Sequence, residues 1–90
     1  MIINMYAIRD KFNGFLTPTC SVNDEVAKRD FAYAINNNPG IMNFEPGDFD
    51  LYRIGTYDSD KGILKAVHPT VFVCKGVEVF TSEKSESYSK

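Results

Sequence analysis

The sequence has no tryptophan, a single histidine and only two cysteines in 90 residues. Two cysteines, Cys20 and Cys74, do not form the disulfide framework that stabilises small secreted domains. The one histidine, His68, cannot make a multi-histidine zinc site, and neither cysteine stands at a metal-ligand spacing from it. The sequence therefore predicts free thiols, a reducing compartment, and neither a metal nor another cofactor.

An excess of positive charge is also missing. The chain has ten Lys and Arg residues and twelve Asp and Glu residues, which gives a formal net charge of −2. Proteins that hold nucleic acid mainly through its phosphates usually carry a basic excess. Nucleic-acid binding by this chain would therefore require a local group of cations or an oligomer that concentrates one.

Long apolar runs are absent. No segment approaches the about 18 consecutive apolar residues of a membrane span. Residues 1–10 lack the basic n-region of a signal peptide, and polar residues interrupt their apolar run. We therefore expect a soluble protein without a membrane partner.

The usual catalytic motifs are missing as well. There is no phosphate-binding loop, no Gly-rich dinucleotide fingerprint and no Gly-x-Ser-x-Gly. A Cys–His dyad built from His68 and Cys20 or Cys74 has no supporting local motif. The acidic residues in 45–50 surround Pro-Gly, which is typical of a turn rather than of paired acid/base carboxylates. We expect a protein that is not an enzyme, with a small hydrolase as the weakest alternative.

The residues that are present indicate an ordinary globular protein, 43% hydrophobic and rich in aromatics, with seven Phe and five Tyr. The length predicts one domain over residues 1–80, and the polar, serine-rich residues 81–90 predict a disordered tail. We expect a strand at 2–9, a short return strand after Asn13-Gly14 in which Pro18 marks an edge, and a helix that Asn23 caps and 36–40 ends. A loop or short turn at 41–48 then leads to a strand at 49–57. Its partner is a strand at 63–67 that Pro69 breaks, and a further strand or small hairpin follows at 70–80. This order predicts an α+β fold, a small mostly antiparallel sheet with one helix packed on one face. The first strand is apolar on both faces, which favours a homodimer.

Residues 58–62, Asp-Ser-Asp-Lys-Gly, admit two interpretations. Asp58 and Asp60 match the first and third positions of a calcium loop, but the later positions fail. The same residues suit a hairpin loop with Gly62 in the left-handed conformation. We therefore predict a turn, with no metal site.

Basic residues alternate with tyrosines along the predicted strands. The candidate phosphate contacts are Arg9, Lys11, Arg53 and Lys65, and the candidate base-stacking residues are Tyr6, Tyr52 and Tyr57. Exposed aromatics beside cations suit single-stranded nucleic acid. Alternatively, the tyrosines lie in the core and the charges form a solvated rim. Composition alone favours this second interpretation, because the net charge is acidic.

Three segments together resemble a known viral family. They are "MYAIRD" (5–10), "NDEVAKRDFAYAINN" (23–37) and "PGDFDLYRIGTYDSDKGIL" (46–64). In this order and spacing they resemble the small non-structural protein of gokushoviruses, single-stranded DNA phages of the Microviridae. The resemblance implies a phage accessory protein in the bacterial host cytoplasm, with single-stranded DNA as partner during genome replication or packaging. It supplies no catalytic residues. The alternative is an adaptor that docks on a phage replication or capsid protein, or on a host factor.

Overall fold

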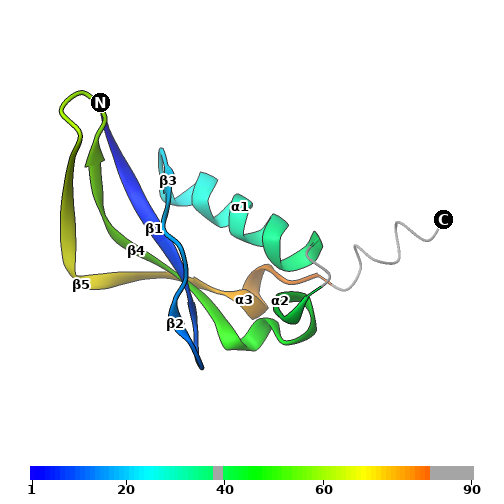
Figure 1. Cartoon of the computed structure of the whole chain (residues 1–90). Coiled ribbons are helices and arrows are strands. Elements are labelled where there is room, and N and C mark those ends of the chain that lie inside the picture. The colour runs from blue at the N-terminus through cyan, green and yellow to red at the C-terminus, as the bar shows by residue number, and fades with distance from the viewer. Residues whose placement is uncertain (38–39, 82–90) are drawn as a thin grey trace.

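The structure, a computed structural model, describes residues 1–37 and 40–81. Its elements are β1 (Ile2–Asp10), β2 (Gly14–Phe15), β3 (Thr19–Ser21), α1 (Asp24–Asn37), α2 (Ile41–Phe44), the 3-10 helix η1 (Pro46–Asp48), β4 (Phe49–Asp58), β5 (Ile63–Lys75) and α3 (Gly76–Val79). The strands form one antiparallel sheet in the order β2-β1-β4-β5, with β3 also paired to β1. The sheet is curled and the helices lie on one side of it (Figure 1). The predicted α+β class is confirmed. The predicted tail lies outside the described residues except for Thr81.

The start of helix α1 follows the expected chemistry. Asn23 accepts a hydrogen bond on Oδ1 from the backbone N–H of Val26 at 2.9 Å, which satisfies one free donor of the first turn. Ala27, Phe31 and Ile35 recur at helical spacing and are all buried. The predicted N-cap and buried stripe of this helix are therefore confirmed.

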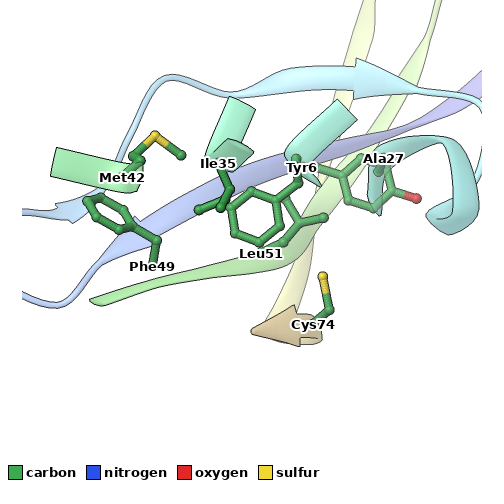
Figure 2. Packing of buried hydrophobic residues seen from close by; sticks show 8 residues of the cluster. Tyr6, Ala27, Ile35, Met42, Phe49, Leu51 and Cys74 are labelled. Carbon is green, nitrogen blue, oxygen red and sulfur yellow. The ribbon is translucent and has the colours of Figure 1, made fainter. Parts of the chain in front are cut away.

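The core lies between α1 and the sheet. Tyr6 from β1, Leu51 and Phe49 from β4 and Cys74 from β5 are each at most 4% exposed. They meet the buried stripe of α1, and Met42 of α2 closes the cluster at one end (Figure 2). The main helix α1, with α2 at one end, therefore covers part of one face of the sheet.

Strand β5 does not end at Pro69, so that prediction is wrong. Arg53 pairs with Val71 and Gly55 pairs with Ala66, so residues 67–70 form an irregularity within a strand that continues to Lys75. Because β5 lies at the edge of the sheet, Pro69 fits there without disrupting a central ladder. The strand therefore passes through the proline and bends (Figure 1).

The chain leaves β5 at Gly76 and turns into α3, so the prediction that 76–80 is a strand or hairpin arm is wrong. A Cβ on Gly76 would lie 2.2 Å from the backbone oxygen of Pro46 and 2.7 Å from that of Phe49. The backbone therefore packs directly against η1 and the start of β4. Residues 41–48, expected as a loop or short turn, contain two short helices.

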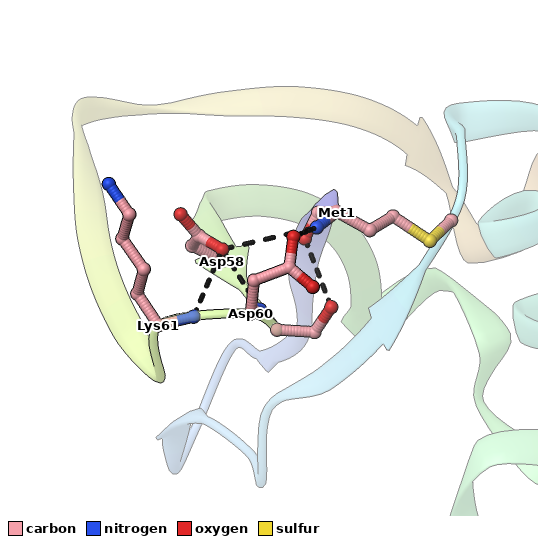
Figure 3. Close-up of polar contacts among 5 residues, drawn as sticks. Met1, Asp58, Asp60 and Lys61 are labelled. Carbon is pink, nitrogen blue, oxygen red and sulfur yellow. Dashed lines mark hydrogen bonds and ion pairs between the residues drawn. The ribbon is translucent and has the colours of Figure 1, made fainter.

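The loop between β4 and β5 is a hairpin turn, as predicted. Gly62 has a φ of +69°, and its N–H donates to the backbone oxygen of Asp58 at 2.7 Å. Asp58 Oδ1 also accepts hydrogen bonds from the N–H groups of Asp60 and Lys61 at 3.0 and 3.3 Å (Figure 3). The ammonium group of Met1 forms an ion pair with Asp60. In the described part of the chain, no three His, Cys, Asp or Glu side chains are grouped as metal ligands would be.

Candidate nucleic-acid interface

The sheet has a second face on which none of the described helices packs (Figure 1). Side chains alternate along a strand, and residues directly paired across antiparallel strands point to the same side. Tyr6 points to the helices, so Ala7 points away from them. Ala7 pairs with Tyr52, and Tyr52 pairs with Phe72. We call the side that carries Ala7, Tyr52 and Phe72 the open face.

Three aromatic side chains cross the open face. The ring centroids of Phe15 and Tyr52 are 5.5 Å apart, and those of Tyr52 and Phe72 are 5.7 Å apart, both in edge-to-face geometry. Phe15 comes from β2 and reaches Tyr52 over β1, where the small Ala7 is only 3% exposed. Phe15 and Phe72 remain 48% and 46% exposed. We call Phe15, Tyr52 and Phe72 the aromatic row.

Two cations and one carboxylate lie at one end of the open face. Arg9 pairs across the strands with Phe15 and with Asp50, and Asp50 pairs in turn with Lys75. All three therefore point to the same side as the aromatic row. Two positive charges against one negative charge leave this end formally basic, although the whole chain is acidic.

The structure does not bring the seven predicted residues together. Arg9, Tyr52 and Tyr57 lie on the open face, where Tyr57 pairs with Ile3. Lys11 follows β1 and is exposed, and its backbone N–H donates to the oxygen of Asp48 at 3.0 Å.

Arg53 and Lys65 lie on the other side of the sheet. Arg53 pairs with Tyr6, and its Nε is 3.7 Å from Asp24 Oδ1 at the start of α1. Lys65 lines a separate hollow beside the β4–β5 hairpin with Thr56.

Tyr6 is not available for base stacking in this structure. Its side chain is 1% exposed, and its hydroxyl donates to Asp24 Oδ1 at 2.5 Å and accepts from Asn4 Nδ2 at 3.1 Å. Burial, followed by the hydrogen bond to Asp24, raises the pKa of Tyr6. Tyr6 therefore anchors the start of α1 to the sheet, which corrects its assignment to the interface.

Sequence reasoning missed Phe15, Phe72 and Lys75. Phe15 follows the Asn-Gly turn directly, so a hairpin register applied from that turn would have placed it across from Arg9. Phe72 and Lys75 lie in 70–80, which was predicted to be a separate strand or small hairpin after a break at Pro69, so their pairing with Tyr52 and Asp50 was not expected. The sequence alone offers no comparable signal for these two residues.

A hollow between α1 and β3 has a volume of about 170 Å³ and a mainly apolar floor that includes Phe31 and Leu51. Asp30 is the one carboxylate in its lining, which also includes the side chain of Tyr6. Burial raises the pKa of Cys74 to about 11, so this thiol is protonated at neutral pH and is a poor nucleophile. The open face is thus the feature with the most distinct binding chemistry.

Among the described residues, no helix has the length and apolarity needed to cross a bilayer. The fold and its open face define a small α+β protein with a curled antiparallel sheet that one main helix covers on one side. Residues 3–79 match the family model described as Phage ORF5 protein, and the chain belongs to this family. No curated protein and no solved structure is significantly similar to it. The resemblance to a phage protein is thereby confirmed at the level of the family.

Proposed function

We propose that this phage protein is a non-enzymatic accessory protein of the gokushovirus kind, within the Microviridae. In this proposal it binds single-stranded DNA in the bacterial host cytoplasm during genome replication or packaging. The observation that supports the proposal is the aromatic row beside Arg9 and Lys75 on a sheet face that the described helices leave uncovered.

The chemistry of the open face suits an unpaired strand better than a duplex. Stacking of a base on an aromatic side chain contributes about 1–3 kcal/mol and tolerates any base. A duplex hides the faces of its bases, whereas a single strand exposes them. Arg9 and Lys75 lie where phosphates of a strand stacked on the aromatic row would pass, with Lys11 near the same end.

The test is fluorescence anisotropy of a labelled single-stranded oligonucleotide at about 50 and about 200 mM salt. We expect micromolar binding that weakens steeply at the higher salt. Phe72→Ala should weaken binding about 5- to 100-fold, the equivalent of one stacked base. The matched control is Phe44→Ala, because Phe44 is 76% exposed on α2, away from the open face. The proposal fails if the parent protein binds at neither salt, or if both variants weaken binding equally.

A specific observation supports the second candidate function, a protein–protein adaptor. Phe12 and Phe44 are 82% and 76% exposed, and Ile41 and Val77 are more than half exposed. They belong to the β1–β2 turn, α2 and α3, which all adjoin η1. Such an apolar end would dock on a phage replication or capsid protein, or on a host factor.

Salt separates the two candidates. Apolar docking hardly responds to salt, whereas phosphate binding changes with a log–log slope near −0.7 per contact for single strands. An adaptor role predicts salt-insensitive capture of a phage or host protein that Phe12→Ala abolishes and Phe72→Ala leaves unchanged. The reverse dependence on the two phenylalanines would contradict it.

A further inference from the structure

A hollow with a volume of about 260 Å³ lies beside the β4–β5 hairpin, on the side of the sheet opposite the open face. Its lining consists of Ile2, Thr56, Asp58, Lys61, Ile63 and Lys65. Thr56 pairs with Lys65 and with Asn4. Asn4 lies two residues before Tyr6, so these side chains leave the side of the sheet that faces α1. The hairpin extends past the described helices, which do not cover this end of the sheet (Figure 1). We call this feature the hairpin hollow.

Two lysines give the hairpin hollow its positive charge. Lys61 and Lys65 are exposed. Within residues 1–37 and 40–81, neither ammonium group forms an ion pair. By contrast, Lys28 on α1 has Glu25 Oε2 as a partner at 3.6 Å. The two charges of the hairpin hollow are therefore open to a ligand.

The one carboxylate in the lining is engaged by the turn itself. Asp58 Oδ1 accepts hydrogen bonds from the N–H groups of Asp60 and Lys61 at 3.0 and 3.3 Å. It also lies 4.0 Å from the ammonium group of Met1 (Figure 3). These donors offset the negative charge of Asp58 locally. An anion in the hairpin hollow therefore meets less repulsion than a free carboxylate would cause.

The other side chains add an apolar wall and a hydroxyl group. Ile2 and Ile63 are 62% and 46% exposed, and both pair with Asp58 across the strands. Thr56 stands beside Lys65, and its hydroxyl can donate or accept a hydrogen bond. A ligand that matches this lining carries a compact anionic group and an apolar body.

We propose that the hairpin hollow binds a phosphate monoester with a small apolar body, of the size of a nucleoside monophosphate. Lysine ammonium groups bind phosphate as point charges. A monoester carries a charge of about −1.5 to −2 at neutral pH, which two lysines complement. An internal phosphate of a DNA strand carries a single charge. The volume is below the about 300–1,000 Å³ of typical ligand sites, so it suits one nucleotide rather than a strand.

This site does not depend on the proposed function. It lies on the opposite side of the sheet from the aromatic row, and it recognises a terminal rather than an internal phosphate. Two sources share this chemistry: a free mononucleotide and the 5′-phosphorylated end of a DNA strand. Separate arms of the experiment distinguish them.

The first arm is a nuclear magnetic resonance titration of the full chain with thymidine monophosphate. Thymidine is the matched ligand without the phosphate. We expect the monophosphate to shift the amide resonances of residues 56–65 with a Kd of about 0.1–1 mM, and thymidine to bind at least about 10-fold more weakly. Lys61→Gln and Lys65→Gln should each weaken binding about 2- to 5-fold. Lys28→Gln removes the same charge from α1 and should bind like the parent.

The matched ligand and the matched variant each give a result that overturns the proposal. Equal binding of thymidine and its monophosphate would show that the phosphate is not recognised. Equal losses in Lys65→Gln and Lys28→Gln would show that only net charge matters. Shifts confined to the open face would place the nucleotide on the aromatic row instead.

The second arm compares two oligonucleotides of about 6 nucleotides, one with a 5′-phosphate and one with a 5′-hydroxyl group. A gain from the phosphate that Lys65→Gln removes would assign the hairpin hollow to strand ends. Binding of thymidine monophosphate without such a gain would assign it to free nucleotides. If neither occurs while the strand still binds, the hairpin hollow is not a phosphate site and the DNA function stands. Nucleotide binding at 56–65 without any strand binding would have the reverse meaning.

Discussion

The two faces of the sheet have nearly the same chemistry and different surroundings. On the helix side, Tyr6, Phe49 and Leu51 are at most 4% exposed beneath α1 and α2. On the open face, Phe15 and Phe72 stand about half exposed around Tyr52. Residue type does not distinguish the faces, because both present aromatic and apolar side chains. The two faces differ in whether a helix covers them. This coverage decides whether an aromatic side chain contributes to stability or remains available to a ligand.

The tyrosines make the contrast clear. Tyr6 turns its hydroxyl to Asp24 and fixes α1 on the sheet, whereas Tyr52 holds the centre of the aromatic row. Both lie next to each other in the sheet, since Ala7, the neighbour of Tyr6, pairs with Tyr52. Substitutions on the two faces should therefore separate stability from binding.

The largest expected effect comes from two phenylalanines in opposite environments. Phe31→Ala removes a ring that is 2% exposed beneath α1 and should lower the free energy of unfolding by about 3–5 kcal/mol. Phe72→Ala should cost only about 1 kcal/mol, because nearly half of its side chain is already exposed. Urea unfolding followed by circular dichroism measures both values. Equal losses would mean that the open face is covered in solution.

The two cysteines give the next contrast. Cys20 is exposed and pairs with Met5 on the open face, whereas Cys74 is 4% exposed and burial raises its pKa to about 11. A thiol reagent should label Cys20 at least about 100-fold faster at neutral pH, because only the accessible thiolate reacts. Mass spectrometry of the parent and of Cys20→Ser checks this. Rapid labelling of Cys20→Ser would place Cys74 at the surface.

A smaller effect is expected from the buried tyrosine hydroxyl. Tyr6→Phe removes hydrogen bonds to Asp24 and Asn4 and should cost about 1–2 kcal/mol, whereas Tyr52→Phe should cost less than about 0.5 kcal/mol.

The pH dependence follows from the same contact. The pKa of Tyr6 is raised in the folded protein, so its stabilising contribution is complete below the unfolded value of about 10 and is lost as pH rises through the folded pKa. Urea midpoints from about pH 8 to about pH 11 should fall less steeply in Tyr6→Phe than in the parent. The Cys74 contribution is common to both proteins and cancels. An identical alkaline slope would contradict the shift.

Local chemistry made much of the fold predictable. Asn23 and the spacing of Ala27, Phe31 and Ile35 identified α1, and Gly62 after two aspartates identified the hairpin. Each of these signals acts over a few residues and needs no knowledge of the rest of the chain. They suffice for the α+β class and for the order of the main elements.

Long-range contacts account for what the sequence did not reveal. Pro69 indicates the end of a strand unless β5 is known to lie at the edge of the sheet. Gly76 indicates a turn unless its close contact with the backbone of Pro46 is known. Tyr6 and Ala7 are both apolar neighbours on a strand, so only the position of α1 tells which of them is covered. The residues predicted for the interface therefore lie on both faces of the sheet.

The smallest predicted effect compares two lysines of β5 that lie on opposite faces. Lys75 lies on the open face beside Asp50, and Lys65 pairs with Thr56 on the other side. If phosphates follow the aromatic row, Lys75→Gln should reduce the log–log salt slope of single-stranded DNA binding by about 0.7, with a few-fold loss of affinity at low salt, and Lys65→Gln should leave the slope unchanged. Both substitutions remove one charge, so net charge alone predicts equal effects. A difference between them would locate the bound strand on the open face, and a larger effect of Lys65 would locate it on the side beside α1.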